Sequence, residues 1–135
     1  HNKEKKMKLK KIIVAAAAMM LANAAQAIET NCDKYSGSYD RTYCLCKLFV
    51  DSDAELNVVY KELKDQLDDS GKNALKKAEV KWLKYRTGRC ETSPGTIDVR
   101  CSYEVNVERT NYLRERSREC RTNRCDKAAI SKESW

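Results

Sequence analysis

The chain has 135 residues, the length of one domain at most. Its formal charge of +7 comes mainly from the first 27 residues, and residues 28–135 carry only +2. This near neutrality argues against a nucleic-acid partner. The only histidine is His1, so residues 28–135 offer no serine–histidine or cysteine–histidine nucleophile pair and no histidine-ligated metal site. We therefore expect neither an enzyme nor a bound cofactor or metal.

The N-terminal segment has the three regions of a secretory signal peptide. A basic MKLKK begins at Met7, an apolar run occupies residues 12–22, and NAAQA supplies a small-residue cleavage site. The apolar run has 11 residues, too few for the roughly 20 that a bilayer-spanning helix needs. We predict a signal peptide at residues 7–27, with residues 1–6 upstream of the initiator, and an exported domain at residues 28–135 in the periplasm or outside the cell.

The firmest predicted element is a long helix at about residues 41–67. Residues 28–40 before it are polar and lack a helical period, so we expect an irregular lead-in. Within the helix, one set of side chains recurs at spacings of three, four or their sums, which places them on one face. This set is Leu45, Leu48, Phe49, Ser52, Leu56, Val59, Tyr60, Leu63 and Leu67.

Two further helices are predicted. The polar break at residues 68–71 supplies N-cap candidates for a helix at about residues 72–89. Residues 91–100 contain the only proline and read as a loop, and a third helix follows at about residues 103–121. The expected apolar face of the second helix is Leu75, Ala78, Trp82 and Tyr85, with Leu83 on its flank. That of the third is Tyr103, Val107, Thr110, Leu113, Ser117 and Cys120.

The expected fold is a single all-α domain with its core at about residues 32–121. Three amphipathic helices joined by short links pack most simply as a long antiparallel helical hairpin plus a third helix. No run of useful length shows the two-residue period of a strand. The tail through Trp135 is polar and has little periodicity, so we expect no element there.

The seven cysteines all lie in residues 28–135, and in an oxidising compartment they indicate disulfides. Cys46 lies two residues from Cys44 on a helix, so the two side chains point to nearly opposite sides. We expect Cys46 to be a buried free thiol, with a disulfide-linked dimer in place of a monomer as the alternative. Local spacing favours three bonds: Cys90–Cys101 across the loop, Cys120–Cys125 at a helix end, and Cys32–Cys44 clamping the lead-in.

One segment is a candidate for contact with a partner. A loop closed by Cys90 and Cys101 and shaped by proline and glycine is preorganised, and it loses little entropy on binding. Its candidate contact residues are Glu91, Pro94, Gly95, Asp98 and Arg100. The acidic residues Asp51, Asp53 and Glu55 could suggest the carboxylate pair of a glycosidase, but on a helix surface we interpret them as a solvated face.

An ordered set of motifs links the three helices. The pattern S-D-x-E-L-N-x-x-Y starts at Ser52, and L-x-x-A-x-x-x-W-L-x-Y-R starts at Leu75. The two cysteines of the loop follow, and then Glu108 and Arg109. Together these residues resemble the LprI-type lysozyme inhibitor N-terminal domain family. The resemblance implies a small exported bacterial helical domain that binds lysozyme and inhibits it.

We expect the motif positions to be mainly structural. Asn57 and Arg86 are predicted to form hydrogen bonds between helices, and Arg86 is predicted to pair with Glu108 or Glu79. The full set of motif positions is Asn57, Tyr60, Trp82, Arg86, Glu108 and Arg109.

The sequence therefore favours an exported, non-enzymatic binding protein, with lysozyme inhibition as the form that the resemblance implies. The alternative is an envelope interaction or structural protein that binds cell-wall polymer or another protein. Charge suggests where such a surface would lie, because residues 28–80 carry a net −3 and residues 81–135 a net +5.

Overall fold

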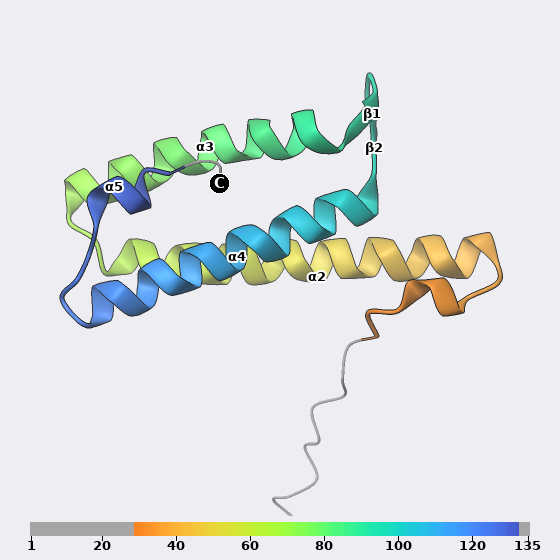
Figure 1. The fold of residues 1–135 in the computed structure, drawn as a ribbon, viewed down its shortest axis with the longest axis horizontal. Coiled ribbons are helices and arrows are strands. Elements are labelled where there is room, and N and C mark those ends of the chain that lie inside the picture. The colour runs from red at the N-terminus through yellow and green to blue at the C-terminus, as the bar shows by residue number, and fades with distance from the viewer. Residues whose placement is uncertain (1–28, 133–135) are drawn as a thin grey trace, which may run out of the picture.

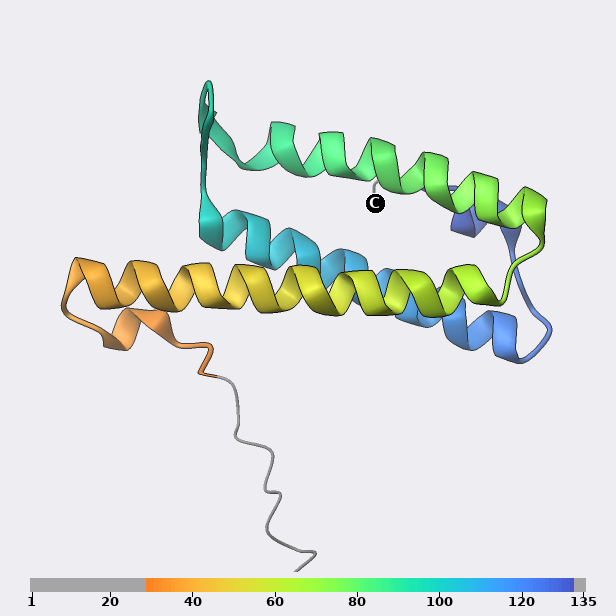
Figure 2. The same cartoon turned by 180° about the vertical axis from the view of Figure 1, so that it is seen from behind.

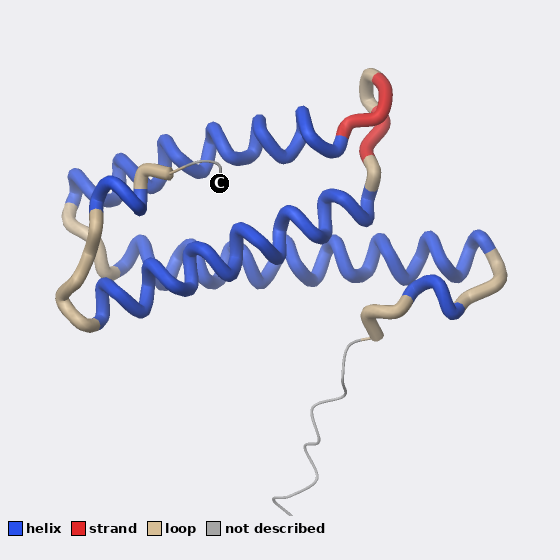
Figure 3. Tube along the Cα trace, viewed as in Figure 1, coloured by secondary structure: helices blue, strands red, loops and turns tan. Residues whose placement is uncertain are grey.

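The computed structural model describes residues 29–132, so the predicted signal peptide lies outside the described residues. The fold is all-α apart from one short hairpin, as predicted (Figures 1 and 3). No helix within the described part is long and apolar enough to cross a membrane. The elements in chain order are η2 (Cys32–Lys34), α2 (Ser38–Asp65), α3 (Asp69–Cys90), β1 (Glu91–Ser93), β2 (Thr96–Ile97), α4 (Val99–Arg121) and α5 (Lys127–Ile130).

The closest packing joins α2 and α4, which run side by side in the same direction (Figures 1 and 2). Helix α3 runs antiparallel to both, as the predicted α2–α3 hairpin requires. However, α3 packs more closely against α4 than against α2. The parallel pair of α2 and α4 is therefore the base of the molecule, and α3 covers it from one side.

The core lies where the buried faces of the three long helices meet. On α2 most of the positions that the periodicity predicts are buried, with Leu56, Val59 and Leu63 at the centre. The exceptions are Leu45, Phe49 and Tyr60, which are half-buried. From α3, Leu75 and Trp82 enter the same cluster, and both are completely buried. Burying a side chain of this size contributes roughly 1.5–3 kcal/mol, so this cluster is the main source of stability.

All three long helices begin earlier than predicted. Helix α2 starts at Ser38 rather than near residue 41, inside the segment expected to be irregular, and aspartates cap the other two. Asp68 accepts a hydrogen bond from the Gly71 amide at 2.7 Å, so α3 starts at Asp69 rather than near residue 72. Asp98 accepts from the Cys101 amide at 3.0 Å, so α4 starts at Val99 rather than near residue 103. Side-chain caps of this kind satisfy amides that the first helical turn leaves free.

The predicted apolar face of α4 is wrong in part. Val107 is 36% exposed, whereas Asn106 and Arg109 are completely buried. The buried face runs through Ser102, Val105, Asn106, Arg109, Thr110, Leu113 and Ser117. The face is shifted because it carries polar side chains, which find their partners on α2 and α3.

The tail also forms an element that its polar sequence does not indicate. Residues Lys127–Ile130 form α5, which packs against α3 and α4. Asp126 caps it, and Ile130 is completely buried in the main core cluster. One helical turn is too short to show a period, so the prediction of an unstructured tail is wrong here.

The structure forms three disulfides, Cys32–Cys44, Cys90–Cys101 and Cys120–Cys125, which are the pairs that the cysteine positions predict. Cys46 has no disulfide, but it is exposed, so the prediction of a buried thiol is wrong. It lies on α2 opposite the core. Three large side chains are exposed on the same face as Cys46, because successive positions differ by three or four residues: Tyr39, Tyr43 and Val50.

Candidate functional site

The segment between Cys90 and Cys101 is a β-hairpin that projects from one end of the helices (Figure 1). Strands β1 and β2 pair antiparallel, with Glu91 opposite Ile97 and Ser93 opposite Thr96. Gly95 has φ of +77°, a conformation that glycine adopts without strain, and this lets Pro94–Gly95 form the turn. Every residue from 91 to 98 is exposed. The hairpin is thus a narrow projection with two free sides.

The base of the hairpin is held by covalent and hydrogen bonds. The Cys90–Cys101 disulfide joins the end of α3 to the start of α4. The Asp98 amide donates to the Cys90 carbonyl at 2.8 Å, closing the same base. Near the tip, the Gly95 amide donates to the Glu91 carboxylate at 2.9 Å. A loop braced in this way loses little conformational entropy when it binds.

The five predicted contact residues fall into two groups. Asp98 caps α4 and Arg100 donates to Asp33 at 2.7 Å, so these two position the hairpin. The Glu91 carboxylate accepts a hydrogen bond from the turn, which Pro94 and Gly95 form. The surface left for a partner is the tip with its neighbours Thr92, Ser93 and Ile97. Ile97 is 46% exposed, and an apolar residue in a polar, disulfide-closed loop is the sequence signal that marks it as a further contact residue.

Arg86 has different partners from those predicted. Its Nη1 donates to Asp53 Oδ1 at 2.9 Å and to Asn106 Oδ1 at 2.7 Å. Its guanidinium also lies over the rings of Phe49 and Trp82. The predicted pairing with Glu108 or Glu79 is therefore wrong, because Arg86 points toward the α2–α4 contact. There it links all three long helices.

Arg109 is the charged residue at the centre of the core, with no exposed side-chain surface. It donates to Glu79 Oε2 from Nε at 3.0 Å and from Nη2 at 2.8 Å, and to the Lys132 carbonyl at 2.9 Å. Its guanidinium lies over Trp82 and Tyr112. Burial raises the pKa of Glu79, and the charge of Arg109 opposes that rise. The pair connects α3, α4 and the end of the described chain.

The other motif positions are less buried than Arg109. Tyr60 is half-buried near the same pair, and burial together with the charge of Glu79 raises the pKa of its hydroxyl. Glu108 forms a salt bridge with Arg89 at 3.5 Å between two half-exposed side chains. Asn57 is exposed on α2, and none of the hydrogen bonds within residues 29–132 joins its side chain to another helix. The predicted inter-helix role of Asn57 is therefore wrong, and Asn106 has it instead, donating to Ser52 Oγ at 3.0 Å.

The arginines of the basic half are mostly neutralised. Of the nine between residues 81 and 132, eight form salt bridges, several of them with carboxylates of α2. Examples are Arg114 with Glu55 and Arg121 with Glu62. The described residues contain no group of three or more His, Cys, Asp or Glu side chains placed to hold a metal ion. The arrangement thus offers rigid surfaces for contact.

These features define a small all-α domain stapled by three disulfides, with a braced hairpin projecting from it. The family model described as "Lysozyme inhibitor LprI" matches residues 30–129. The chain therefore belongs to the LprI lysozyme inhibitor family. Neither the search of curated proteins nor the search of solved structures finds a match.

Proposed function

We propose that this protein is an exported inhibitor that binds lysozyme directly. Membership of the LprI family over residues 30–129 is the observation that carries the proposal. Three disulfides favour an oxidising compartment, the periplasm or the outside of the cell, which agrees with the signal peptide predicted at residues 7–27. An inhibitor in that compartment is in the place where lysozyme attacks the cell wall.

The hairpin supports a specific mode of binding, insertion of its tip into the substrate cleft. Enzyme clefts are concave, and a narrow projection fits them better than a flat helix face does. The tip carries the hydroxyl of Ser93 and no basic residue, whereas the hydroxyl of Thr92 donates to the Thr96 carbonyl at 3.3 Å. Lysozyme cleaves with two carboxyl groups, and hydroxyls can donate hydrogen bonds to them. Because the base of the hairpin is braced, the tip keeps its shape on binding.

Charge supports the same partner. Lysozymes are commonly basic, and residues 28–80 carry a net −3. A negative region on one partner and a positive one on the other raise the association rate. We expect a rise in ionic strength to lower the association rate and to change the dissociation rate much less.

The proposal is tested by lysozyme clearing of a cell-wall suspension, with the oxidised protein of residues 28–135 in excess. We expect slower clearing, which recovers as lysozyme is added beyond the inhibitor. The assay should include several lysozyme types, because the family does not specify which one is the target. Unchanged clearing rates with all of them would refute the inhibitor function.

A further inference from the structure

The hairpin and the end of α3 meet at an angle. Strand β1 starts directly after Cys90, the last residue of α3. From there the hairpin rises past α3 on the side away from α2 and α4 (Figures 1 and 2). The exposed hairpin and the exposed face of α3 therefore form the two sides of a corner.

A shallow hollow lies in this corner. Its volume is about 420 Å³, and its lining consists of Leu83, Lys84, Thr87, Gly88 and Glu91. Glu91 belongs to β1 and the other four to α3, so the hollow is continuous with the hairpin. Leu83 is 40% exposed and gives the lining its large apolar side chain. The lining has one ammonium and one carboxylate, so its net charge is zero, and shape and apolar contact decide what fits there.

Gly88 leaves part of the hollow open. It lies inside α3, two residues before the last residue of the helix. A Cβ atom at this position would meet no atom within 4 Å, and the backbone is helical. Neither close packing nor the backbone conformation therefore requires a glycine, although glycine weakens a helix. This space, which the fold does not need, lets another chain approach closely.

The length of the hairpin limits what can enter the corner. Strand β1 has three residues, Glu91–Ser93, which span about 10 Å at roughly 3.3 Å per residue. When the tip lies inside a cleft, the wall of that cleft runs alongside the strand. It therefore ends within about 10 Å of the base of the hairpin, where the hollow lies.

We propose that this corner holds the wall of the lysozyme substrate cleft, with an uncharged segment of that wall seated against Leu83 and Gly88. The inference rests on the proposed function and adds a second contact to the same binding mode. Leu83 on α3 and Ile97 on β2 supply exposed apolar surface on both elements of the corner. Such contacts slow dissociation, whereas charge mainly sets the association rate.

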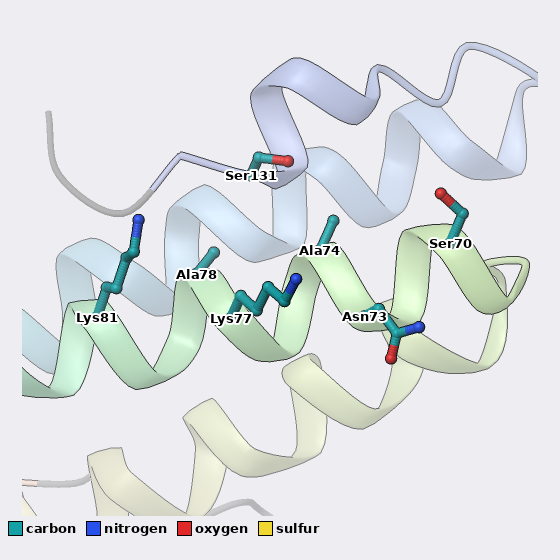
Figure 4. A pocket seen from close by; sticks show the side chains of 7 residues that line it. All are labelled: Ser70, Asn73, Ala74, Lys77, Ala78, Lys81 and Ser131. Atoms are coloured by element: carbon teal, nitrogen blue, oxygen red, sulfur yellow. The ribbon is translucent and has the colours of Figure 1, made fainter.

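A larger groove lies between α3 and α5, toward the start of α3 (Figure 4). Its lining includes Ser70, Lys77 and Ser131, and no residue of the hairpin. Ser70 precedes Cys90 by about 30 Å along the helix, at 1.5 Å per residue. A cleft wall beside the tip does not reach that far, so this groove offers a control position on the same helix.

The test measures the association and dissociation rates of oxidised residues 28–135 with a lysozyme that the wild type inhibits. Gly88→Gln fills the hollow with an uncharged side chain, and the control Ser70→Gln puts the same side chain in the groove at the other end of α3. Leu83→Ala removes apolar surface from the hollow, and the control Val58→Ala removes it from the exposed side of α2. We expect both hollow variants to dissociate at least about fivefold faster, and both controls to stay within about twofold of the wild type.

The same experiment separates folding, the corner contact and the proposed function. Glutamine favours a helix more than glycine does, so Gly88→Gln should melt at or above the wild-type temperature, and faster dissociation is then not a result of unfolding. If the wild type inhibits lysozyme and both hollow variants dissociate as slowly as their controls, the corner contact is overturned while the inhibitor function stands. Failure of the wild type to inhibit any lysozyme would overturn both.

Discussion

At the scale of single residues, the buried polar side chains determine how the three helices fit together. Arg109 is fully buried, yet each of its donors toward Glu79 and Lys132 has an acceptor within 3.0 Å. Asn106 and Arg86 form a second set of bonds to α2. Such bonds have fixed directions, so they specify one register of the helices where apolar contacts alone would allow several.

Removing the partner of Arg109 should destabilise the protein strongly. In Glu79→Ala the guanidinium stays buried without its carboxylate, and we expect the free energy of unfolding to fall by about 3–5 kcal/mol. The matched control is Glu108→Ala, which breaks a half-exposed salt bridge with Arg89 and should cost less than about 1 kcal/mol. Urea unfolding of the two variants measures both. Equal losses would contradict a structural role for the buried pair.

The same residues show where sequence reasoning reaches its limit. The predicted face of α4 includes Val107 because an apolar side chain is expected in the core, but Val107 is exposed while Asn106 and Arg109 are buried. Apolar periodicity cannot identify a polar residue as buried, because that depends on a partner on another helix. The family motif marks Arg86 and Arg109 as important, but it does not say which carboxylate each one meets.

At the scale of elements, the Cys90–Cys101 disulfide should matter for both stability and the shape of the hairpin. It closes a loop with a sequence separation of 11 residues, and the chain-entropy model predicts roughly 3 kcal/mol for a loop of this size. The variant C90S/C101S should lose about that much in urea unfolding, and its hairpin amides should exchange faster with solvent.

The comparison variant for this loss is C120S/C125S, whose disulfide has a separation of only 5 residues. A shorter loop restricts the unfolded chain less, so this variant should lose only about 2 kcal/mol. Its hairpin amides should exchange as in the wild type. Faster hairpin exchange in C120S/C125S would show that the hairpin depends on global stability rather than on its own brace.

The N-cap of α3 gives a prediction about pH. The Gly71 amide and then Lys127 lower the pKa of Asp68 from its ordinary 3.8. A lowered folded-state pKa adds stability above the unfolded value and loses it as the pH falls through the folded value. Asp68→Asn keeps the cap but not the charge, so the wild type should be the more stable protein at pH values above 3.8 and should lose that advantage as the pH falls below 3.8 and through the folded-state pKa. A pH-independent difference between the two would contradict the titration of this cap.

Elements differ in how readily the sequence reveals them. The long helices were predictable because each has enough turns to show a period, and their ends shift by a few residues where an aspartate caps them. The cysteine pairs follow from their places at helix ends. Helix α5 was missed because its four residues contain one informative side chain, Ile130, whose burial depends on the helices that receive it.

At the scale of the whole molecule, the arrangement of the helices determines which charged side chains are paired. The parallel packing of α2 and α4 brings carboxylates of α2 onto arginines of α4, which neutralises much of the charge of both. Helix α3 takes part as well, through Arg86 with Asp53 of α2 and Glu79 with Arg109 of α4. The sequence could not predict this, because short links give the direction of neighbouring helices but not which pair packs most closely.

If the hairpin tip contacts lysozyme, as we propose, a bulky cationic side chain at the tip should weaken inhibition. Ser93→Lys adds a long cationic side chain at the tip, and Thr42→Lys adds the same side chain on the exposed surface of α2. With a lysozyme that the wild type inhibits, we predict that the inhibition constant of Ser93→Lys rises by at least about tenfold and that of Thr42→Lys stays near the wild-type value. Undiminished inhibition by Ser93→Lys would contradict the account.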